Sequence, residues 1–310
     1  MKRTINIGTR GSQLALWQAN HIKSVLESRY SEHTFKLVKI KTTGDKILDV
    51  ALSKVGGKGL FVKELEDALL EEKVDFAVHS MKDVPVILPE GLHLTAITKR
   101  EDPRDCFVSK NYNSIVDLPK NSKIGTSSLR RQCQLLYFRP DLKIEILRGN
   151  VETRIRKMVE GSFHAVILAY AGLKRLNLTE YVKEVLSEDI SLPAIGQGAL
   201  GIECRVADKE INEMLSVLND YDTSCCVKAE RAFLRVLEGG CQVPIGAFAR
   251  ITSNKLILTG LVGSLDGRKL IKETVSGEVT DAEALGEALA EAILNKGGRD
   301  ILKEVYGREI

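Results

Sequence analysis

Short apolar segments of strand type alternate with longer segments of helical periodicity over roughly the first 180 residues. Residues 4–8 alternate polar and apolar side chains, and a helical stripe from Ala15 to Leu26 follows, with Ser12 as its cap. The series continues with a strand, a helix and a strand, at 34–42, 61–69 and 74–78. This order of elements predicts βαβ units built on parallel strands.

The pattern restarts after Pro103 and changes near Asp222. The restarted part contains Ala165–Ala169, an unbroken apolar run typical of a strand buried on both faces. Beyond Asp222 a helix is followed by three predicted strands, near 247–251, 255–262 and 269–279. Thr280–Glu283 then has the pattern of a capping box that opens a last helix. Consecutive strands with short connections predict a small antiparallel sheet backed by helices.

Composition places the chain among ordinary globular proteins, since 44% of its 310 residues are hydrophobic and 28% are charged. No apolar run approaches the roughly 20 residues that span a bilayer, and the first residues lack the apolar stretch of a secretory signal. Six cysteines are too sparse for a disulfide scaffold, and neither C-x-x-C nor H-E-x-x-H occurs. We therefore expect a cytoplasmic protein with free thiols, no membrane partner and no metal site.

Positive charge is concentrated in one stretch. Residues 126–156 hold seven basic and three acidic side chains, so their net charge of +4 exceeds the +3 of the whole chain. Six of the seven bases are arginines, whose planar fork matches carboxylates and phosphates. Aromatic residues make up only 5%, which is thin for a base-stacking surface, so a small polyanion is favoured over nucleic acid.

Polar residues follow four of the predicted strands, and ligands of open α/β sheets bind beyond the carboxyl ends of strands. These residues are Arg10 and Ser12; Ser80, Lys82 and Asp83; Thr126, Ser127 and Ser128; and Arg148. A single Arg or Ser at a strand end is more often a solvated loop or cap residue. The same chemistry at four ends instead predicts one site on a common cleft rim, with the helix start at 126–128 offering free N–H groups to an anion.

Two residues have both an ordinary and a functional interpretation. Asp83, beside Lys82, is either a salt-bridge partner or a charge that stabilises a developing cation and carries a proton. Cys241 follows two glycines and precedes Gln242-Val243-Pro244, which describes a presented thiol, although most cysteines are small buried hydrophobes. Cys225 and Cys226 lie in a predicted helix and keep the buried interpretation.

Two glycine motifs do not indicate nucleotide binding. Gly196–Gly201 spells G-x-G-x-x-G, but the residues that follow it have a strand pattern instead of the required helix. Gly57-Lys58-Gly59 lacks the other residues of a phosphate loop.

At this point the sequence resembles the porphobilinogen deaminase family, also called hydroxymethylbilane synthases, over nearly its whole length. The motifs that carry the resemblance are Gly8–Ala15, His79–Pro85, Gly125–Arg131, Arg148–Arg154, Gln197–Ala199 and Glu238–Cys241. The resemblance implies an α/β fold with two lobes like those of periplasmic binding proteins and a small α+β C-terminal domain with a three-stranded antiparallel sheet. The implied domains are 1–99 with 198–217, then 104–192, then 221–310.

The resemblance also implies a transferase of tetrapyrrole (haem) biosynthesis that acts as a monomer. It would condense four porphobilinogen molecules, with loss of ammonia, onto a dipyrromethane primer held through a thioether to Cys241. Asp83 matches the catalytic carboxylate. The implied cofactor contacts are Ser12, Ser80, Lys82, Asp83, Thr126, Ser128, Arg130, Arg131, Arg148 and Arg154. The implied substrate contacts are Arg10, Gln18, Arg148, Arg154, Arg175 and Gln197.

Two other classes of function remain open from the residues alone. One is a two-lobed protein that binds a carboxylate ligand without catalysis, and the other is a nucleic-acid binder that uses the arginine-rich stretch. Only the deaminase interpretation requires a covalent pyrrolic adduct.

Overall fold

The structure, a computed structural model, describes residues 3–46, 59–238 and 243–308. The described residues form two compact units. The first comprises those within Met1–Leu48, Gly57–Arg100 and Ala199–Ser224, and the second those within Glu101–Gly198 and Cys225–Ile310. The second unit holds two separate sheets, and the division of the chain into three domains stays a prediction.

The first unit is built on a five-stranded mixed sheet. In spatial order its strands are β2 (Thr34–Lys39), β1 (Thr4–Thr9), β3 (Phe76–Ser80), β10 (Leu200–Arg205) and β4 (Leu92–Ile97). β1 runs parallel to β2 and β3, as the βαβ pattern predicts, whereas β10 runs antiparallel to both of its neighbours. β10 enters the sheet from more than 100 residues later in the chain, so local periodicity does not reveal its direction.

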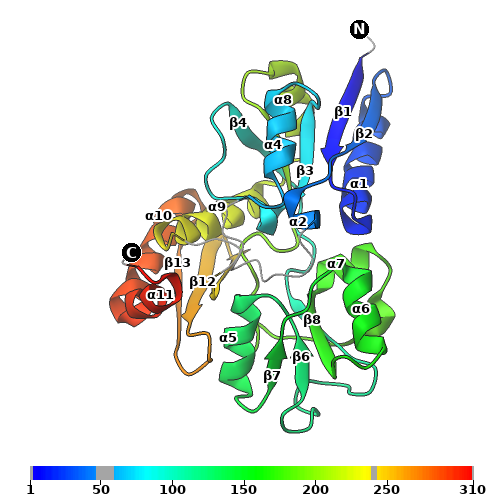
Figure 1. The fold of residues 1–310 in the computed structure, drawn as a ribbon. Helices are drawn as coiled ribbons and strands as arrows, with labels where there is room; N and C mark the ends of the chain where they lie inside the picture. Colours follow the sequence, from blue (N-terminus) through cyan, green and yellow to red (C-terminus); the bar gives the residue numbers. More distant parts are fainter. Residues whose placement is uncertain (1–2, 47–58, 239–242, 309–310) are drawn as a thin grey trace. The chain divides into compact units, whose positions relative to one another are not determined.

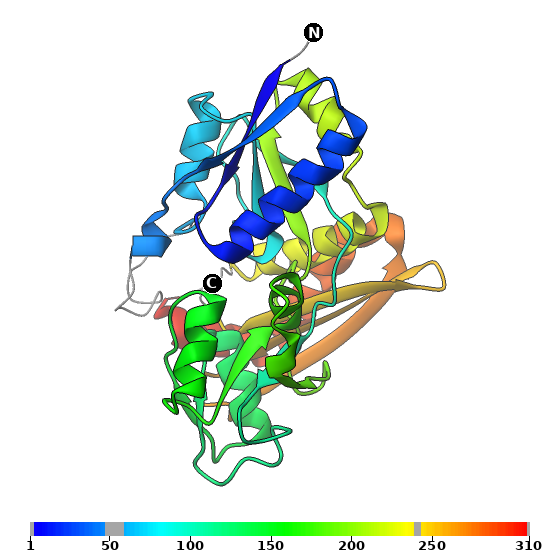
Figure 2. The same cartoon turned by 90° about the vertical axis from the view of Figure 1, so that its right-hand side faces the viewer.

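Helices cover both faces of this sheet. α1 (Gln13–Arg29) and α8 (Lys209–Ser216) bury an apolar cluster that includes Ile22 and Ile211 on one face. α4 (Lys63–Leu70) packs on the other face through Leu65 and Leu69, and a short α2 (Thr43–Lys46) precedes it. Figures 1 and 2 show α1 lying across the strands that it covers. A hydrophobic interior thus fixes the strand ends that carry the candidate residues of this unit.

The second unit contains another five-stranded sheet, whose order is β7 (Lys143–Glu145), β6 (Lys123–Gly125), β8 (Ala165–Ala169), β5 (Asp105–Val108) and β9 (Val182–Val185). β8 is buried along nearly its whole length, which confirms the interpretation of its apolar run. β6 is parallel to β7 and β8, while β5 is antiparallel to β8. The helices are α5 (Leu129–Phe138), α6 (Val151–Val159) and α7 (Tyr170–Arg175).

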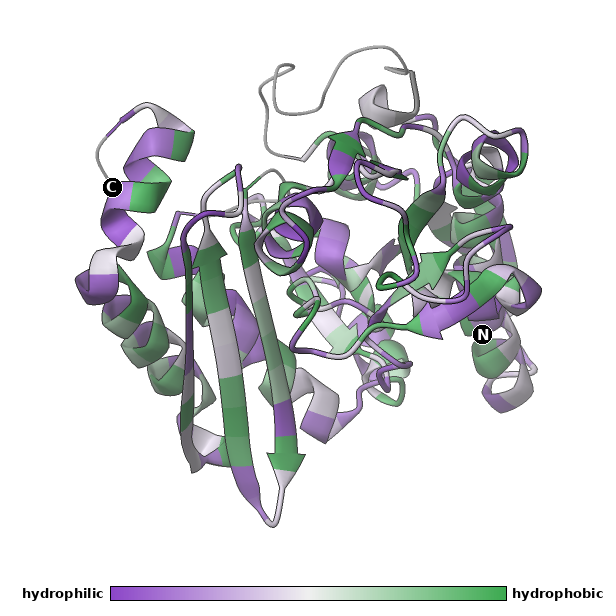
Figure 3. Ribbon diagram, turned by 90° about the horizontal axis from the view of Figure 1, so that it is seen from below, coloured by the Kyte–Doolittle hydropathy of each residue, from purple (hydrophilic) through white to green (hydrophobic). Residues whose placement is uncertain are grey.

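The C-terminal part of the second unit is an antiparallel sheet of three strands, β11 (Ile245–Thr252), β12 (Lys255–Gly263) and β13 (Leu270–Glu278). Its helices are α9 (Tyr221–Val236), which this unit contains from Cys225 on, α10 (Ala282–Ile293) and α11 (Arg299–Tyr306). Figure 3 shows α10 alongside the strands, where Leu289 and Ile293 join the apolar cluster. The fold class is therefore confirmed as two α/β sheets with an added three-stranded antiparallel sheet.

Two predicted helix starts are confirmed and one predicted cap is wrong. Ser12 caps α1 by accepting a hydrogen bond from the Ala15 N–H, and Ser128 caps α5 in the same way. At α10 the N-cap is Asp281, and its side chain makes no capping bond. The hydroxyl of Thr280 instead donates to the Asp281 carboxylate, so the expected capping box does not form. None of the described helices combines the length and apolar character needed to cross a membrane.

The contact of α10 with α9 depends on Gly286. A Cβ at Gly286 would clash with the Ala229 carbonyl oxygen and would lie 2.7 Å from the Cβ of Ala232. Alanine ordinarily stabilises a helix by about 1 kcal/mol relative to glycine. Overpacking against a backbone atom costs about 1–3 kcal/mol or more, so we expect it to outweigh the gain in helix propensity.

We therefore expect Gly286→Ala to lower the free energy of unfolding by about 1 kcal/mol or more. Urea unfolding followed by circular dichroism measures the change. Ala288→Ser, on the exposed side of α10, is the control and should stay within about 0.5 kcal/mol of wild type. A Gly286→Ala protein at least as stable as wild type would contradict the close approach of the two helices.

Candidate functional site

In the first unit, the candidate residues follow two adjacent parallel strands. β1 ends at Thr9, just before Arg10 and Ser12, and β3 ends at Ser80, just before Lys82 and Asp83. The registers Ile7 with Phe76 and Gly8 with Ala77 place the two strands side by side. Parallel neighbours end at the same edge of a sheet, so these two groups share one edge, as expected.

Hydrogen bonds tie the two groups together. Gln18, buried on α1, donates through Nε2 to Ser80 Oγ at 2.9 Å, and the Ser80 hydroxyl lies 3.2 Å from Gln18 Oε1. Arg10 places its guanidinium 4.4 Å from the centre of the Phe61 ring, a cation–π distance. The predicted site residues at the ends of β1 and β3 and on α1 therefore lie in one region of the first unit.

Asp83 lies on a single 3₁₀ turn, Met81–Asp83, directly after β3. Met81 is buried and its N–H donates to the Ala199 carbonyl oxygen at 3.0 Å, which fixes the turn to the start of β10. Asp83 itself is half-buried, and within the described part of the chain no side chain or N–H pairs with its carboxylate. The ordinary interpretation of Asp83 as a salt-bridge partner thus finds no support among these residues.

In the second unit, Thr126, Ser127 and Ser128 join β6 to α5. The Thr126 hydroxyl accepts from the Ser128 N–H at 3.2 Å, and the Ser127 hydroxyl donates to the Leu147 carbonyl oxygen at 2.6 Å. The second bond connects the end of β6 with the residue before Arg148. β6 and β7 are parallel, so their ends lie at the same edge of this sheet.

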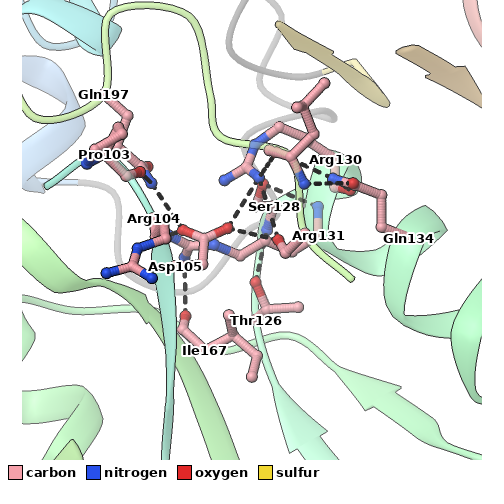
Figure 4. A network of polar contacts seen from close by, with 12 residues as sticks. Pro103, Arg104, Asp105, Thr126, Ser128, Arg130, Arg131, Gln134, Ile167 and Gln197 are labelled. Atoms are coloured by element: carbon pink, nitrogen blue, oxygen red, sulfur yellow. Dashed lines mark hydrogen bonds and ion pairs between the residues drawn. The ribbon is translucent and has the colours of Figure 1, made fainter. Parts of the chain in front are cut away.

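The two arginines that open α5 are buried against Asp105, which sequence reasoning did not single out. Asp105 is fully buried, and Arg130 and Arg131 contact its two oxygens at 2.9 and 2.7 Å. The Ser191 hydroxyl and Gln197 Nε2 also donate to it, at 2.8 and 2.9 Å. Figure 4 shows Asp105 in the centre of this network. Two cations share one carboxylate, so one net positive charge remains for a ligand.

Electrostatics keep this carboxylate ionised. Burial alone would raise the pKa of Asp105, but the charges and hydrogen bonds of Arg130 and Arg131 outweigh burial and hold the pKa far below its usual range. Burial lowers the pKa of Arg130, yet an ordinary value above 12 leaves its guanidinium charged. Asp105 is the first residue of the buried strand β5. An acidic residue at the start of an apolar strand was the one sequence feature that could have pointed to a buried ion pair.

Backbone carbonyls hold three of the candidate arginines of this unit. Arg131 donates to the Ile167 carbonyl oxygen at 2.8 Å, Arg154 to that of Gly149 at 2.8 Å, and Arg175 to that of Gly198 at 2.6 Å. Burial lowers the pKa values of Arg148 and Arg175. Such half-buried cations interact strongly with anions, because little water screens them.

The Arg131 side chain also has an unused donor. Its Nε is buried and finds no acceptor in residues 3–46, 59–238 and 243–308. A carboxylate of a bound molecule would satisfy such an N–H.

Cys241 lies outside the described residues, so its predicted role stays a prediction. The other five cysteines are buried and form no disulfide among the described residues, which confirms the ordinary interpretation of Cys225 and Cys226. Burial raises the pKa values of Cys106, Cys133 and Cys204 to about 12, so these thiols are poor nucleophiles. In the described part of the chain, no group of three His, Cys, Asp or Glu side chains is placed to hold a metal ion.

Each unit is of α/β type and carries hydroxyls and arginines at the ends of parallel strands, an arrangement suited to an anionic ligand. The first unit adds the carboxylate of Asp83, which has no partner among the described residues. Family models give the particular family. One described as "Porphobilinogen deaminase, dipyromethane cofactor binding domain" matches residues 5–213, and one for the C-terminal domain of the same family matches residues 224–295. The chain belongs to the porphobilinogen deaminase family.

Curated relatives agree over the full length. The chain is 60% identical over 306 residues to the porphobilinogen deaminase of Geobacter sulfurreducens, covering 99% of this chain and 96% of that protein. It is 58% identical over 308 residues to that of Pelobacter propionicus, covering 99% of each.

Solved structures with a similar backbone include a periplasmic VFT2 domain of BvgS from Bordetella pertussis, at 12% identity and a TM-score of 0.42. The match covers 69% of this chain and 85% of that domain. The substrate-binding protein of an amino acid ABC transporter is similar at 13% identity and a TM-score of 0.41, covering 69% and 91%. Nothing about function follows from likeness at this level.

Asp105→Asn should destabilise the second unit strongly, because it leaves two buried guanidiniums without their anion. Breaking a buried pair in this way costs about 3–5 kcal/mol, which urea unfolding at pH 7 can measure. The folded-state pKa of Asp105 is depressed, so its contribution is complete above the unfolded value of about 4 and is lost as pH falls below it. The difference in the free energy of unfolding between variant and wild type should therefore become smaller below about pH 4.

Asp141→Asn is the matched control, because it removes a carboxylate from an arginine pair that is partly exposed, with Arg139. We expect a much smaller loss there, since water screens that pair. Equal losses in the two variants would contradict the central role of Asp105.

Proposed function

We propose that this chain is a transferase that condenses four porphobilinogen molecules, with loss of ammonia at each step, to give hydroxymethylbilane. The match to family models and relatives across the whole chain carries the proposal. In each condensation a C–N bond of the substrate breaks, ammonia leaves, a C–C bond forms and a proton is released. After the fourth condensation the C–C bond to the primer breaks, the primer carbon takes a proton, and the hydroxyl of a water molecule completes the product. The proposal includes the monomeric state and the cytoplasmic location that the sequence resemblance implies.

Asp83 is the proposed catalytic residue. Loss of ammonia leaves an azafulvenium-type cation with a charged pyrrole N–H, and a carboxylate at that nitrogen stabilises the charge and can accept its proton. The Asp83 carboxylate has no partner among the described residues, and its turn is fixed by Met81. A positioned and uncommitted carboxylate is what this step requires.

The arginines and hydroxyls supply the anion sites. Each pyrrole brings two carboxylates, so a lengthening chain needs many cations and N–H donors. The proposed set is Arg10, Ser12, Gln18, Ser80, Lys82, Thr126, Ser128, Arg130, Arg131, Arg148, Arg154, Arg175 and Gln197. Within this set, Arg130 and Arg131 both pair with Asp105 and so also stabilise the fold. The Nε of Arg131, which has no acceptor among the described residues, suits a ligand carboxylate.

A dipyrromethane, when bound, supplies the pyrrole carbon to which the first substrate is joined. The donor set fits such a group, because its acidic side chains match the arginines and the buried Nε of Arg131. Cys241 is the proposed anchor, since its Gly-Gly-Cys setting favours an accessible thiol, while burial makes at least three of the other cysteines unreactive. Anchoring keeps elongation close to an intramolecular reaction.

The mass of the intact protein tests the anchor. We expect an addition equal to two linked pyrrole units on the peptide that contains Cys241, and its loss in Cys241→Ser. Cys225→Ser is the control and should keep the addition, because Cys225 is buried in α9. An active enzyme without the addition, or an addition on another cysteine, would overturn the assignment, and an unmodified inactive protein would favour a non-catalytic carboxylate binder.

Single-turnover release of ammonia tests Asp83. Asp83→Asn removes the charge but keeps the size, so it should fold, and turnover should fall by about 10²- to 10⁴-fold. Asp83→Glu keeps the charge but displaces it, and partial activity is expected. Glu90→Gln, an exposed acid shortly after the turn, is the control and should react at the wild-type rate. An Asp83→Asn rate within about threefold of wild type would refute the catalytic role.

A further inference from the structure

Two glutamates and a histidine form a buried cluster in the first unit. Glu203 on β10 is fully buried, and its Oε2 lies 2.9 Å from Nε2 of His79 on β3, which is also buried. Glu66 is buried on α4, and the negative charge of Glu203 acts on it and raises its pKa. None of the three belongs to the proposed substrate or cofactor contacts.

The hydrogen-bonding capacity of the cluster is only partly satisfied by the described residues. One oxygen of each glutamate, Glu66 Oε1 and Glu203 Oε1, is buried without a donor among the described residues. Apolar side chains including Leu65, Leu69 and Ala77 form the core on this face of the sheet. Two ionised carboxylates with one imidazole would leave uncompensated charge in an apolar interior, which is costly. A retained proton removes that charge.

The same face of the sheet holds the turn that carries Asp83. His79 precedes Ser80, the last residue of β3, and pairs with Gly201 of β10, two residues before Glu203. A Cβ at Gly201 would lie 2.9 Å from Sδ of Met81, so the turn rests directly on this glycine. β10 therefore contacts the turn at Met81 and the end of β3 at His79.

We propose that Glu203 and His79 are positioning residues for the Met81–Asp83 turn, and that Glu66, buried on the same face of the sheet, retains a proton. The hydrogen bond from His79 to Glu203 fixes the end of β3 against β10 across the sheet. The retained proton keeps the cluster neutral enough to stay buried. The positioning role rests on the proposed function, whereas the retained proton does not.

Titration of Glu66 agrees with this arrangement. The pKa of Glu66 is raised to about 7, mainly by burial and then by the charge of Glu203, while His79 partly opposes the shift. The other charged group that acts on it is Asp67 of its own helix; among the described residues, β1 and β4 bring no charged group to it. Because the pKa of Glu66 is higher in the folded state, the free energy of unfolding falls as pH rises from about 4.5 to about 7.

Glu66→Gln tests the retained proton without any substrate. Gln cannot ionise, so the variant should gain thermal stability over wild type at pH 8 and not at pH 5, with gains differing by at least about 2 °C. Glu72→Gln, at an exposed acid just beyond the same helix, is the control and should show no such pH dependence. If Glu66→Gln differed from wild type in melting temperature by the same amount at the two pH values, the proposal of a retained proton would be wrong.

Glu203→Gln and Glu203→Asp test positioning in the full-length protein that carries its covalent adduct. Gln keeps the reach to His79 and Asp does not, so kcat should fall further in Asp, by about tenfold or more, with KM changed less than about twofold. Recovery toward wild type in Gln separates positioning from a general loss of folding. Unchanged kcat in both folded variants, or losses confined to KM, would refute the positioning role.

The two arms separate this proposal from the proposed function. If wild type releases no ammonia from porphobilinogen, the proposed function fails, while the pH-dependent stability of Glu66→Gln is still decisive for the proton. If wild type is active and only the Glu203 variants behave normally, the positioning role alone fails.

Discussion

The insertion of β10 between β3 and β4 is the constraint on which the first unit depends. Without this strand both neighbours would have an unpaired edge in the middle of the sheet, where backbone groups are far from water. β10 also brings Arg205, whose guanidinium donates to the carbonyl oxygens of Leu69 and Val74 at 2.6 and 2.8 Å. These bonds join the end of α4 and the approach to β3 to the same strand. The turn with Asp83 is therefore supported by a segment far away in the sequence.

In the second unit, two arginine side chains are buried, and their charges must be compensated. Arg130 and Arg131 lie in the first turn of α5, where the helix dipole already favours negative charge. Asp105 from β5 offsets these charges and makes their burial tolerable. Gln197 ties the same carboxylate to the chain beyond β9 and donates to the Pro103 carbonyl oxygen at 2.6 Å. A single acid thus orders side chains from several segments.

Local signals were sufficient for much of the fold. The caps Ser12 and Ser128, the buried strand β8 and the three-stranded sheet follow from residue type and spacing within a short window. The polar residues after β1 and β3 were also found from sequence, because the ends of parallel strands share one edge. The direction of β10, the partner of Arg130 and Arg131 and the cluster around Glu203 were not predictable. Each depends on contacts between residues that are far apart in the sequence, and the periodicity of a short segment carries no information about such contacts.

Asp83 and Asp105 show that environment decides what a carboxylate does. Asp105 receives two guanidiniums, a hydroxyl and an amide, so its negative charge is fully committed to structure. Asp83 is held by the backbone of its turn and leaves its carboxylate without a partner among the described residues. A committed charge cannot respond to a cation that appears during a reaction, because its neighbours already satisfy it. An uncommitted charge on a fixed turn can respond at once, since no protein contact has to break first.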